Sequence, residues 1–224
     1  MKQRTTPAII LRRTNYGEAD KIITFLTPIG KVKAIVKGVR RSKSKMAGGI
    51  ELFSESTITF LETRGNLARI ISTRLEHYYD TIVGDLQRMM FGYEAMKLLD
   101  KIIEDEAERD FFDLLKATLD SLADLETTLA ATEMWFYIRL LKLQGKEPNL
   151  ATDSKGRALS KDELYTFSVD SMTFEVSTAG SFTPDHIKLL RLSQNHAPKI
   201  LKQIKNYKKL SEDLQVLAKQ LINI

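Results

Sequence analysis

The fold of the N-terminal part of the chain is decided by the stretch Lys21-Ile22-Ile23-Thr24-Phe25-Leu26-Thr27-Pro28-Ile29-Gly30-Lys31-Val32-Lys33-Ala34-Ile35-Val36-Lys37. Its first run, 21–26, is rich in β-branched and aromatic residues, and its second run, 31–37, begins by alternating basic and apolar residues. Both patterns are typical of β-strands, and residues 27–30 between them have the composition of a hairpin turn. The stretch therefore predicts a β-hairpin with a half-buried second strand.

Three further strand patterns surround this hairpin. An apolar run precedes it at 8–11, an alternating run covers 51–62, and residues 67–75 form a fifth strand after the turn at 64–66. Five short strands in about seventy residues, joined by short turns and one long loop, fit a small closed barrel of the OB type. An SH3-like barrel has similar statistics, so periodicity alone leaves that choice open.

From residue 85 the spacing of the apolar residues changes to three and four, as in amphipathic helices. This pattern predicts helices over 85–103, 109–123 and 126–144, the last one ended by Gly145. We expect their apolar stripes, which in the first helix include Leu86, Met90 and Tyr93, to form the core of a bundle.

A polar insertion follows at about 149–181. It contains two short β-like runs, 165–169 and 172–176, which predict a hairpin around Asp170-Ser171. Helix resumes after Thr183, a suitable N-cap residue. The expected fold is therefore α+β, with an N-terminal five-stranded OB-type β-barrel over 1–78 and a helical-bundle domain with a small β-hairpin insertion over 79–224.

Charge is distributed unevenly along the chain. The whole chain carries a net charge of +5, but residues 1–50 contain twelve Lys or Arg against two acidic residues. Residues 81–133 contain five basic residues against thirteen acidic ones, and residues 186–224 contain eight against two. A positive field of this kind raises the local concentration of polyanions. Nucleic acid is the first candidate partner, and an acidic protein tail is the second.

Several classes of function lack their signatures. The chain has no cysteine and only three widely separated histidines, which excludes disulfides, thiolate nucleophiles and cysteine-ligated zinc. It contains no phosphate-binding P-loop, no GxSxG motif and no HExxH motif. We expect a protein that is not an enzyme, with no catalytic residue, cofactor or metal. The sequence has no apolar run long enough for a membrane span or a signal peptide, so we expect it in the cytoplasm.

The strongest local signal is the basic loop after the second strand of the hairpin. Lys and Arg neutralise phosphates with little sequence preference, Ser42 and Ser44 can donate to phosphate oxygens, and Gly38, Gly48 and Gly49 are expected to keep the loop flexible. Such a loop can also be only a solvated surface, but beside an OB-type barrel we favour nucleic acid. The predicted DNA-binding residues are Arg12, Arg13, Lys31, Lys33, Lys37, Arg40, Arg41, Lys43, Lys45, Arg69 and Arg74, with Arg64 as a weaker candidate.

OB-type grooves usually stack bases on aromatic rings. The barrel offers Tyr16, Phe25, Phe53 and Phe60, of which Phe25 and Phe60 are expected in the core.

The only two acids of the basic head, Glu18 and Asp20, have no third ligand and no histidine beside them. We therefore expect a structural role for them, capping backbone amides or pairing with Lys or Arg.

A second basic run lies near the C-terminus, at Lys199, Lys202, Lys205, Lys208 and Lys209. Its first three members share roughly one face of a helix. The run can be a second DNA contact, a cradle for an acidic peptide or the solvated face of a helix, and from the sequence we favour the solvated face.

Three pieces of the N-terminal region resemble the signature of the RecO family of bacterial DNA repair and recombination mediators, in the right order and at the right spacing. They are Tyr16-Gly17-Glu18-Ala19-Asp20, Leu26-Thr27-Pro28-Ile29-Gly30-Lys31 and Lys37-Gly38-Val39-Arg40-Arg41-Ser42-Lys43-Ser44. The resemblance implies an OB domain and a helical domain, ATP-independent binding and annealing of DNA strands, and help in loading RecA onto DNA coated by single-strand-binding protein. It further implies RecR, sometimes RecF, and the acidic C-terminal tail of single-strand-binding protein as partners.

The sequence departs from the family at one point. Many members carry a four-cysteine zinc site after a Gly-x-x-Pro that matches Gly145 to Pro148. The first cysteine pair of that site is replaced here by 152–156, and the second pair falls near Ser177. Without thiolates we predict a metal-free insertion held by the hairpin residues Phe167 and Phe174.

The resulting hypothesis is a mediator of recombinational DNA repair that binds single- and double-stranded DNA. Candidate residues for binding the acidic tail are Lys97, Lys101, Arg139 and Lys142, chosen as basic residues on otherwise acidic or apolar helices. Two alternatives remain open, an RNA-binding OB-fold protein and an adaptor that binds acidic protein tails.

Overall fold

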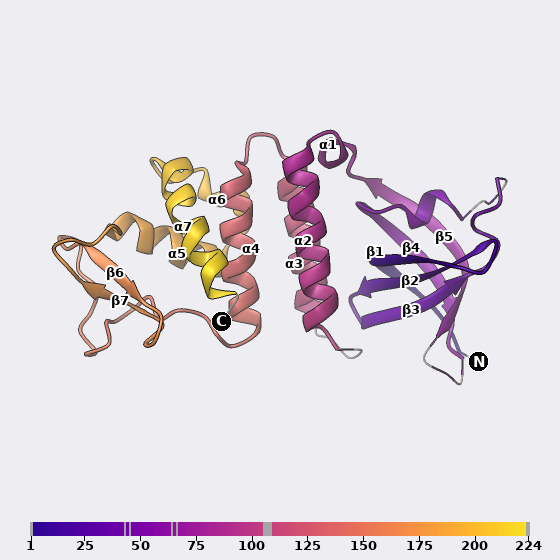
Figure 1. Cartoon of the computed structure of the whole chain (residues 1–224), viewed down its shortest axis with the longest axis horizontal. Helices are drawn as coiled ribbons and strands as arrows, with labels where there is room; N and C mark the ends of the chain where they lie inside the picture. The colour runs from indigo at the N-terminus through magenta and orange to yellow at the C-terminus, as the bar shows by residue number, and fades with distance from the viewer. Residues whose placement is uncertain are drawn as a thin grey trace. The chain divides into compact units, whose positions relative to one another are not determined.

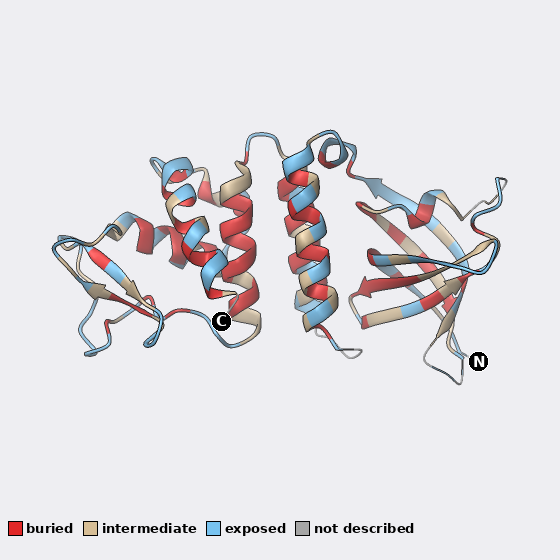
Figure 2. Ribbon diagram, viewed as in Figure 1, coloured by how far each residue is buried: buried red, intermediate tan, exposed pale blue. Residues whose placement is uncertain are grey.

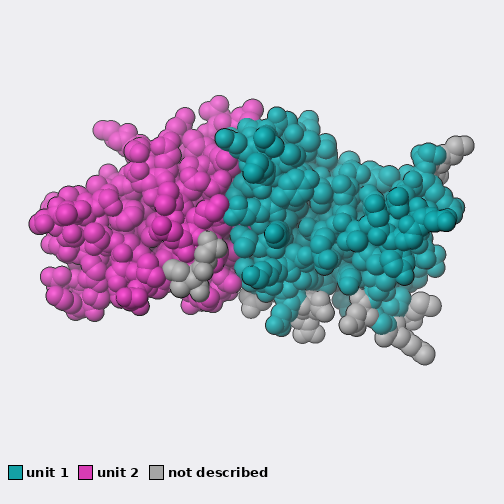
Figure 3. All heavy atoms as spheres, in the orientation of Figure 1, with its two compact units in different colours: residues 1–123 teal, residues 124–224 magenta. Residues whose placement is uncertain are grey.

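The computed structural model describes residues 2–42, 44, 46–63, 65, 67–104 and 109–222. They form two compact units, Met1–Ala123 and Asp124–Ile224 (Figure 3). The elements of the first unit are β1 (Gln3–Tyr16), β2 (Asp20–Thr27), β3 (Gly30–Val36), the 3-10 turn η1 (Gly48–Ile50), β4 (Ser54–Leu61), β5 (Ala68–Tyr78), α1 (Asp80–Val83), α2 (Leu86–Ile102) and α3 (Arg109–Ala123). Those of the second unit are α4 (Leu129–Leu143), β6 (Tyr165–Ser168), β7 (Thr173–Val176), α5 (Pro184–Asn195), α6 (Pro198–Leu201) and α7 (Tyr207–Leu221) (Figure 1).

The five strands of the first unit form a closed barrel with the order β1-β2-β3-β5-β4. Strand β1 pairs antiparallel with β4 through its first half and with β2 through its second half, and a bulge between Ile10 and Arg12 bends it between the two. A short parallel pairing, with Ala34 opposite Ala68, joins β3 to β5 and closes the barrel. This topology confirms the predicted OB-type barrel.

Buried residues recur along the strands (Figure 2). Their side chains point to one face of the curved sheet and fill the barrel. Phe25 and Phe60, which the sequence placed in the core, are both buried there. Ile50 of η1 belongs to the same cluster, so the segment after the basic loop closes one end of the barrel.

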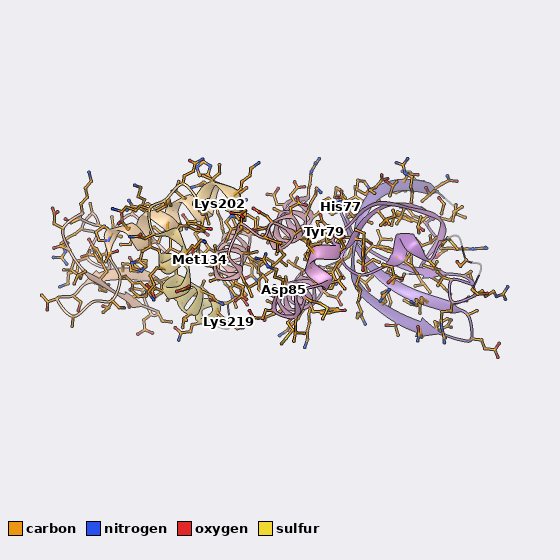
Figure 4. All side chains as sticks on the ribbon, turned by 90° about the horizontal axis from the view of Figure 1, so that it is seen from above. His77, Tyr79, Asp85, Met134, Lys202 and Lys219 are labelled. Atoms are coloured by element: carbon orange, nitrogen blue, oxygen red, sulfur yellow. The ribbon has the colours of Figure 1, made fainter. Side chains whose placement is uncertain are left out.

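The helices of the first unit pack against the barrel. α2 begins after Asp85, whose carboxylate accepts hydrogen bonds from the backbone N–H groups of Gln87 (2.9 Å) and Arg88 (3.1 Å). α2 and α3 then contact β1, and α3 also contacts β2. At the point where β5 leads into the helices, the rings of His77 and Tyr79 meet edge to face, with 4.4 Å between their centroids (Figure 4).

In the second unit, α4 packs against α5, α6 and α7. Thr128 caps its start by accepting a hydrogen bond from the Ala131 N–H, and Gly145, with φ at +67°, follows its end as predicted. The predicted hairpin is present as β6 and β7. The ring of Phe174 meets the rings of Phe167 (5.0 Å between centroids) and Phe182 (5.4 Å) edge to face.

The helix bounds agree closely with the periodic patterns, and α3 begins and ends where the sequence predicted. The strands end at Tyr78, but the compact first unit continues through α3 to Ala123. The predicted domain boundary near residue 78 therefore stays a prediction. In the part of the chain that the structure describes, no helix combines the length and the hydropathy needed to cross a bilayer.

Candidate nucleic-acid interface

One face of the barrel gathers the basic strand residues. Because side chains alternate along a strand, the register of β1, β2, β3 and β5 places one set of residues on the outer surface. Part of this surface is open to solvent, and we call it the open face. It consists of Thr14, Tyr16, Ile22, Lys33, Ile35, Lys37 and Arg69.

Helices cover the other part of the same surface. Leu26 is completely buried and Thr24 is nearly so, although both point outward from β2 by the register. α2 and α3 pack here, and Asp100 near the end of α2 receives the Arg12 guanidinium at 2.9 Å. The outer surface is therefore divided between a covered half and the open face.

Lys31 belongs to the covered half and not to the open face. Its Nζ donates to the backbone oxygens of Asp100 (2.8 Å) and Ile103 (2.9 Å) and pairs with the Asp100 carboxylate at 3.3 Å. Only 16% of its side chain is exposed. The ammonium satisfies carbonyl groups that the C-terminus of α2 leaves without a helical partner. This predicted DNA-binding residue thus has a structural role.

Arg13 also has internal partners. Its Nη1 donates to the Ile50 backbone oxygen (3.2 Å) and to a carboxylate oxygen of Glu51 (2.7 Å). These contacts attach the segment after the basic loop to β1. Arg74 at the other end of the barrel is well exposed, but it pairs with Glu76 at 2.8 Å.

The start of the basic loop is fixed against the turn between β1 and β2. The Asp20 carboxylate accepts the Gly38 N–H at 2.7 Å and pairs with Lys37 at 3.0 Å. The Gly38 N–H, followed by the Lys37 ammonium, holds the pKa of Asp20 below its ordinary value. Arg40 adds two contacts, from its backbone N–H to the Ala19 oxygen (2.9 Å) and from Nη1 to the Gly17 oxygen (3.1 Å). The structural role predicted for Asp20 is therefore present.

Two of the loop glycines are used for shape and not for flexibility, contrary to the expectation from the sequence. Gly38 has φ at +65°, a conformation that side chains disfavour. At Gly49 a Cβ atom would lie 2.5 Å from the Thr73 Oγ1, so only glycine allows this close approach to β5.

The cations that remain available lie on and beside the open face. Lys33, Arg41 and Arg69 are exposed and form no ion pair with any described residue. Lys37 keeps more than half of its side chain exposed despite its pairing with Asp20. Lys43, Lys45 and Arg64, which the sequence also proposed, lie outside the described residues.

One aromatic ring accompanies these cations. Tyr16 is 53% exposed, whereas Phe25, Phe53 and Phe60 are buried. Ile22 and Ile35, which the sequence analysis did not single out, are partly exposed apolar neighbours on the same face. A groove beside the open face is lined by residues of β3, the end of β4 and the turn after it, among them Ile29, Lys33, Glu62 and Thr63.

The candidate partner-binding residues fall into two groups. Arg139 and Lys142 direct their side chains at the Gln194 backbone oxygen, and Lys142 also donates to Asn195 Oδ1 at 2.9 Å. They therefore satisfy the C-terminal end of α5. Lys97 and Lys101 are exposed on α2 instead.

Three apolar side chains that precede Lys97 and Lys101 on α2 are exposed, contrary to the expectation that they form the core of a bundle. Leu86, Met90 and Tyr93, which were predicted in the bundle core, are 65%, 61% and 44% exposed. They precede the two lysines on the same stripe of α2, which we call the α2 stripe. The signal was ambiguous because α2 has apolar residues on several faces, so periodicity could not tell the exposed stripe from the buried one.

No metal site is built from the insertion or elsewhere in the described part of the chain, where no cluster of three His, Cys, Asp or Glu side chains could hold an ion. The segment that replaces the family's first cysteine pair contains Asp153, whose carboxylate accepts the N–H groups of Lys155 (3.0 Å) and Arg157 (2.9 Å) and pairs with the Arg157 guanidinium (2.6 Å). These bonds hold the loop, and the metal-free insertion stays a prediction for metal analysis.

Comparison with known proteins identifies the family to which the chain is related. Residues 1–79 match the model described as "Recombination protein O N terminal", and residues 83–212 match "Recombination protein O C terminal". A "DNA repair protein RecO" of Roseiflexus sp. is 33% identical over 84% of this chain and 64% of its own length. One of Exiguobacterium sp. is 29% identical over the whole chain and 89% of its own length. In the Roseiflexus, Desulfatibacillum and Moorella relatives the match spans only 53% to 64% of the relative. The family models cover most of the chain, which therefore belongs to the recombination protein O family.

Proposed function

We propose that this protein is a DNA-binding mediator of recombinational DNA repair, without a catalytic centre, which binds single- and double-stranded DNA through the open face. The observation that carries the proposal is the open face itself, where the exposed Tyr16 shares one outer surface with Lys33 and Arg69, which are exposed and form no ion pair with any described residue. The names of the relatives, which are DNA repair proteins, support the same function. The protein would act in the bacterial cytoplasm, at the nucleoid.

The proposed contacts follow from the geometry. Lys33, Lys37 and Arg69 on the open face, with Arg40 and Arg41 beside the β1–β2 turn, neutralise phosphates and release condensed counterions. Lys43 and Lys45 continue the same loop in sequence. Arg13 and Lys31 are left out because an acidic side chain or carbonyls of the first unit engage them and leave little of their side chains exposed. Arg12 is well exposed, but it lies opposite Thr24 of the covered half and pairs with Asp100, so it is a peripheral candidate. Arg74 remains a peripheral candidate because Glu76 offsets its charge.

Recognition of single strands adds stacking to this electrostatic term. Tyr16 lies on the outer surface of β1, where a base can stack on its ring. Ile22 and Ile35 on the same face offer apolar contacts to the bases. Stacking and phosphate contacts are tolerant of sequence, as strand annealing requires. Annealing needs no catalytic group, because charge neutralisation brings two strands together and base pairing supplies the free energy.

The partners are part of the proposal. We place the acidic C-terminal tail of single-strand-binding protein on the α2 stripe, where Lys97 and Lys101 follow the exposed Leu86, Met90 and Tyr93. An apolar surface next to two cations suits a peptide that combines apolar and acidic residues. Docking there would bring the protein to coated strands and help RecA to load, with RecR, and RecF in some bacteria, as further partners.

The test is annealing of two complementary labelled oligonucleotides without added nucleotide, with bare strands and with strands coated by single-strand-binding protein. The proposal predicts faster annealing in both cases, and a loss of the effect on coated strands alone in the Lys97→Ala/Lys101→Ala variant. Binding without annealing would point to a general OB-fold binder, and preference for RNA over DNA of equal length would point to an RNA-binding protein. Absence of binding near physiological salt would leave an adaptor for acidic tails.

A further inference from the structure

Acidic residues are missing from two long stretches of the chain. Residues 21–50 contain eight Lys or Arg and no Asp or Glu, and they supply most of the proposed DNA contacts. Residues 186–211 contain seven Lys or Arg and again no Asp or Glu. No other acid-free stretch reaches twenty residues, and these two lie in different compact units. The second unit therefore carries a basic segment of the same kind as the first.

The structure separates the lysines of the second segment into two groups. Lys202 (Figure 4) forms an ion pair with Asp124 at 2.5 Å, and Lys209 forms one with Asp213 at 2.9 Å. Lys199, Lys205 and Lys208 are exposed and form no ion pair with any described residue. We call these three the α6–α7 lysines.

The backbone brings the α6–α7 lysines to one corner of the unit. α6 ends at Leu201, and Asn206, with φ at +62°, makes the turn from the connecting segment into α7. Tyr207 fixes this corner, because its side chain is buried and its hydroxyl donates to the Glu126 backbone oxygen at 3.0 Å. The three exposed lysines therefore belong to a segment whose backbone is anchored to the rest of the unit.

We propose that the α6–α7 lysines form a second surface for the phosphate backbone of DNA, separate from the open face of the barrel. The inference rests on the proposed function and extends it to the second unit. The chemistry fits a phosphate backbone better than a peptide, because the large apolar side chains that the described second unit exposes all lie outside 186–211. Docked peptides usually anchor apolar residues, whereas lysines alone contact phosphates without reading sequence.

Two such surfaces on one chain give annealing a simple physical basis. The open face holds one strand, and the α6–α7 lysines hold the backbone of a second strand. Loss of the second surface should then leave binding of a first strand intact and slow annealing, which separates this inference from the proposed function.

The experiment uses the full chain and two differently labelled oligo-dT strands, which cannot pair with each other. The first strand is immobilised and saturated with protein, and capture of the second strand is measured. The variant Lys199→Ala/Lys205→Ala/Lys208→Ala is compared with Lys146→Ala/Lys155→Ala/Lys161→Ala, which removes the same charge from exposed sites that each lie within two residues of an acid. Thermal unfolding confirms that both variants are folded.

We expect the affinity for the first strand to stay within about twofold of the wild-type value in both variants. Capture of the second strand and the rate of annealing should fall about tenfold in the Lys199→Ala/Lys205→Ala/Lys208→Ala variant and stay unchanged in the control. The salt slope of second-strand capture should fall by about two units, at about 0.7 per lost contact with a single strand. Equal capture by the two variants, or no capture by the wild-type protein, would overturn the inference. So would loss of poly-glutamate binding with unchanged DNA capture. Failure of the wild-type protein to hold the first strand would instead contradict the proposed function.

Discussion

Two lysines of β3 show how strongly position decides the role of a charged residue. Lys31 and Lys33 lie two residues apart on the same outer surface. Lys31 is enclosed by the end of α2, whereas Lys33 stands on the open face. From the sequence the two are equivalent members of a basic strand, and nothing local tells which one a helix seventy residues later will cover.

This difference gives a matched pair of variants. Lys31→Met leaves backbone oxygens of Asp100 and Ile103 without their donor and should lower the free energy of unfolding by about 1–3 kcal/mol. It should not change the salt slope of DNA binding. Lys33→Met should leave stability nearly unchanged and reduce the slope by about 0.7. Denaturant unfolding and salt-dependent anisotropy test both, and a reduced slope in Lys31→Met would restore that residue to the interface.

Tyr16 is predicted to contribute to affinity for single strands by stacking. Tyr16→Ala should weaken binding of a single-stranded oligonucleotide by about 1–3 kcal/mol without changing the salt slope. Tyr16→Phe retains the ring and should bind like the wild-type protein. Equal affinity of all three proteins would remove Tyr16 from the interface.

The lowered pKa of Asp20 predicts that the stability of the protein depends on pH. Because its pKa is lower in the folded protein than in the unfolded chain, its contribution is complete above the unfolded pKa of about 3.9 and is lost as pH falls through the lower folded value. Asp20→Asn should therefore melt at a lower temperature than the wild-type protein at pH 6, and the gap should narrow toward pH 3. A gap that stays constant with pH would show that charge is not the cause.

At the scale of elements, the sequence predicted most of the fold because hydrophobic periodicity is local. The five strands, the bounds of α3 and the β6–β7 hairpin were all accessible in this way. The covered half of the barrel was not, since it depends on the packing of α2 and α3 against β1. The exposed α2 stripe was missed for the same reason, as an all-round apolar helix does not reveal which face its neighbours cover.

The joint between barrel and α2 depends on a close approach at Gly92. A Cβ atom there would lie 2.5 Å from the Phe53 ring, and Phe53 is buried with φ at +58°, so it has little room to move. Gly92→Ala should destabilise the protein by about 1–2 kcal/mol, as overpacking exceeds the gain in helix propensity.

Gly84→Ala is the matched control, because its Cβ would meet only ordinary contacts at 3.7 Å and its backbone is already helical. Chemical denaturation of both variants gives the comparison. A Gly92→Ala protein as stable as Gly84→Ala would mean that Phe53 does not limit this joint.

At the scale of the molecule, the charge pattern predicted a basic surface but not which of its cations remain available in the folded chain. The basic head was evident from the sequence, and Lys33, Lys37, Arg40, Arg41 and Arg69 remain available in the structure. Arg12, Arg13 and Lys31 are engaged by Asp100, Glu51 and backbone oxygens, which are distant in sequence. Ion pairing across such distances is a property of the folded chain, so a count of charges in the sequence overestimates the number of cations without internal partners.

The most direct test of the proposed interface is the salt dependence of oligo-dT binding by three proteins. They are the wild-type protein, Lys33→Ala/Arg40→Ala/Arg41→Ala/Arg69→Ala, and the charge-matched control Lys2→Ala/Lys146→Ala/Lys155→Ala/Lys161→Ala. The open face predicts that the slope of log affinity against log salt falls by about three units in the first variant and stays at the wild-type value in the control. A wild-type slope in the first variant would contradict the assignment of DNA binding to the open face.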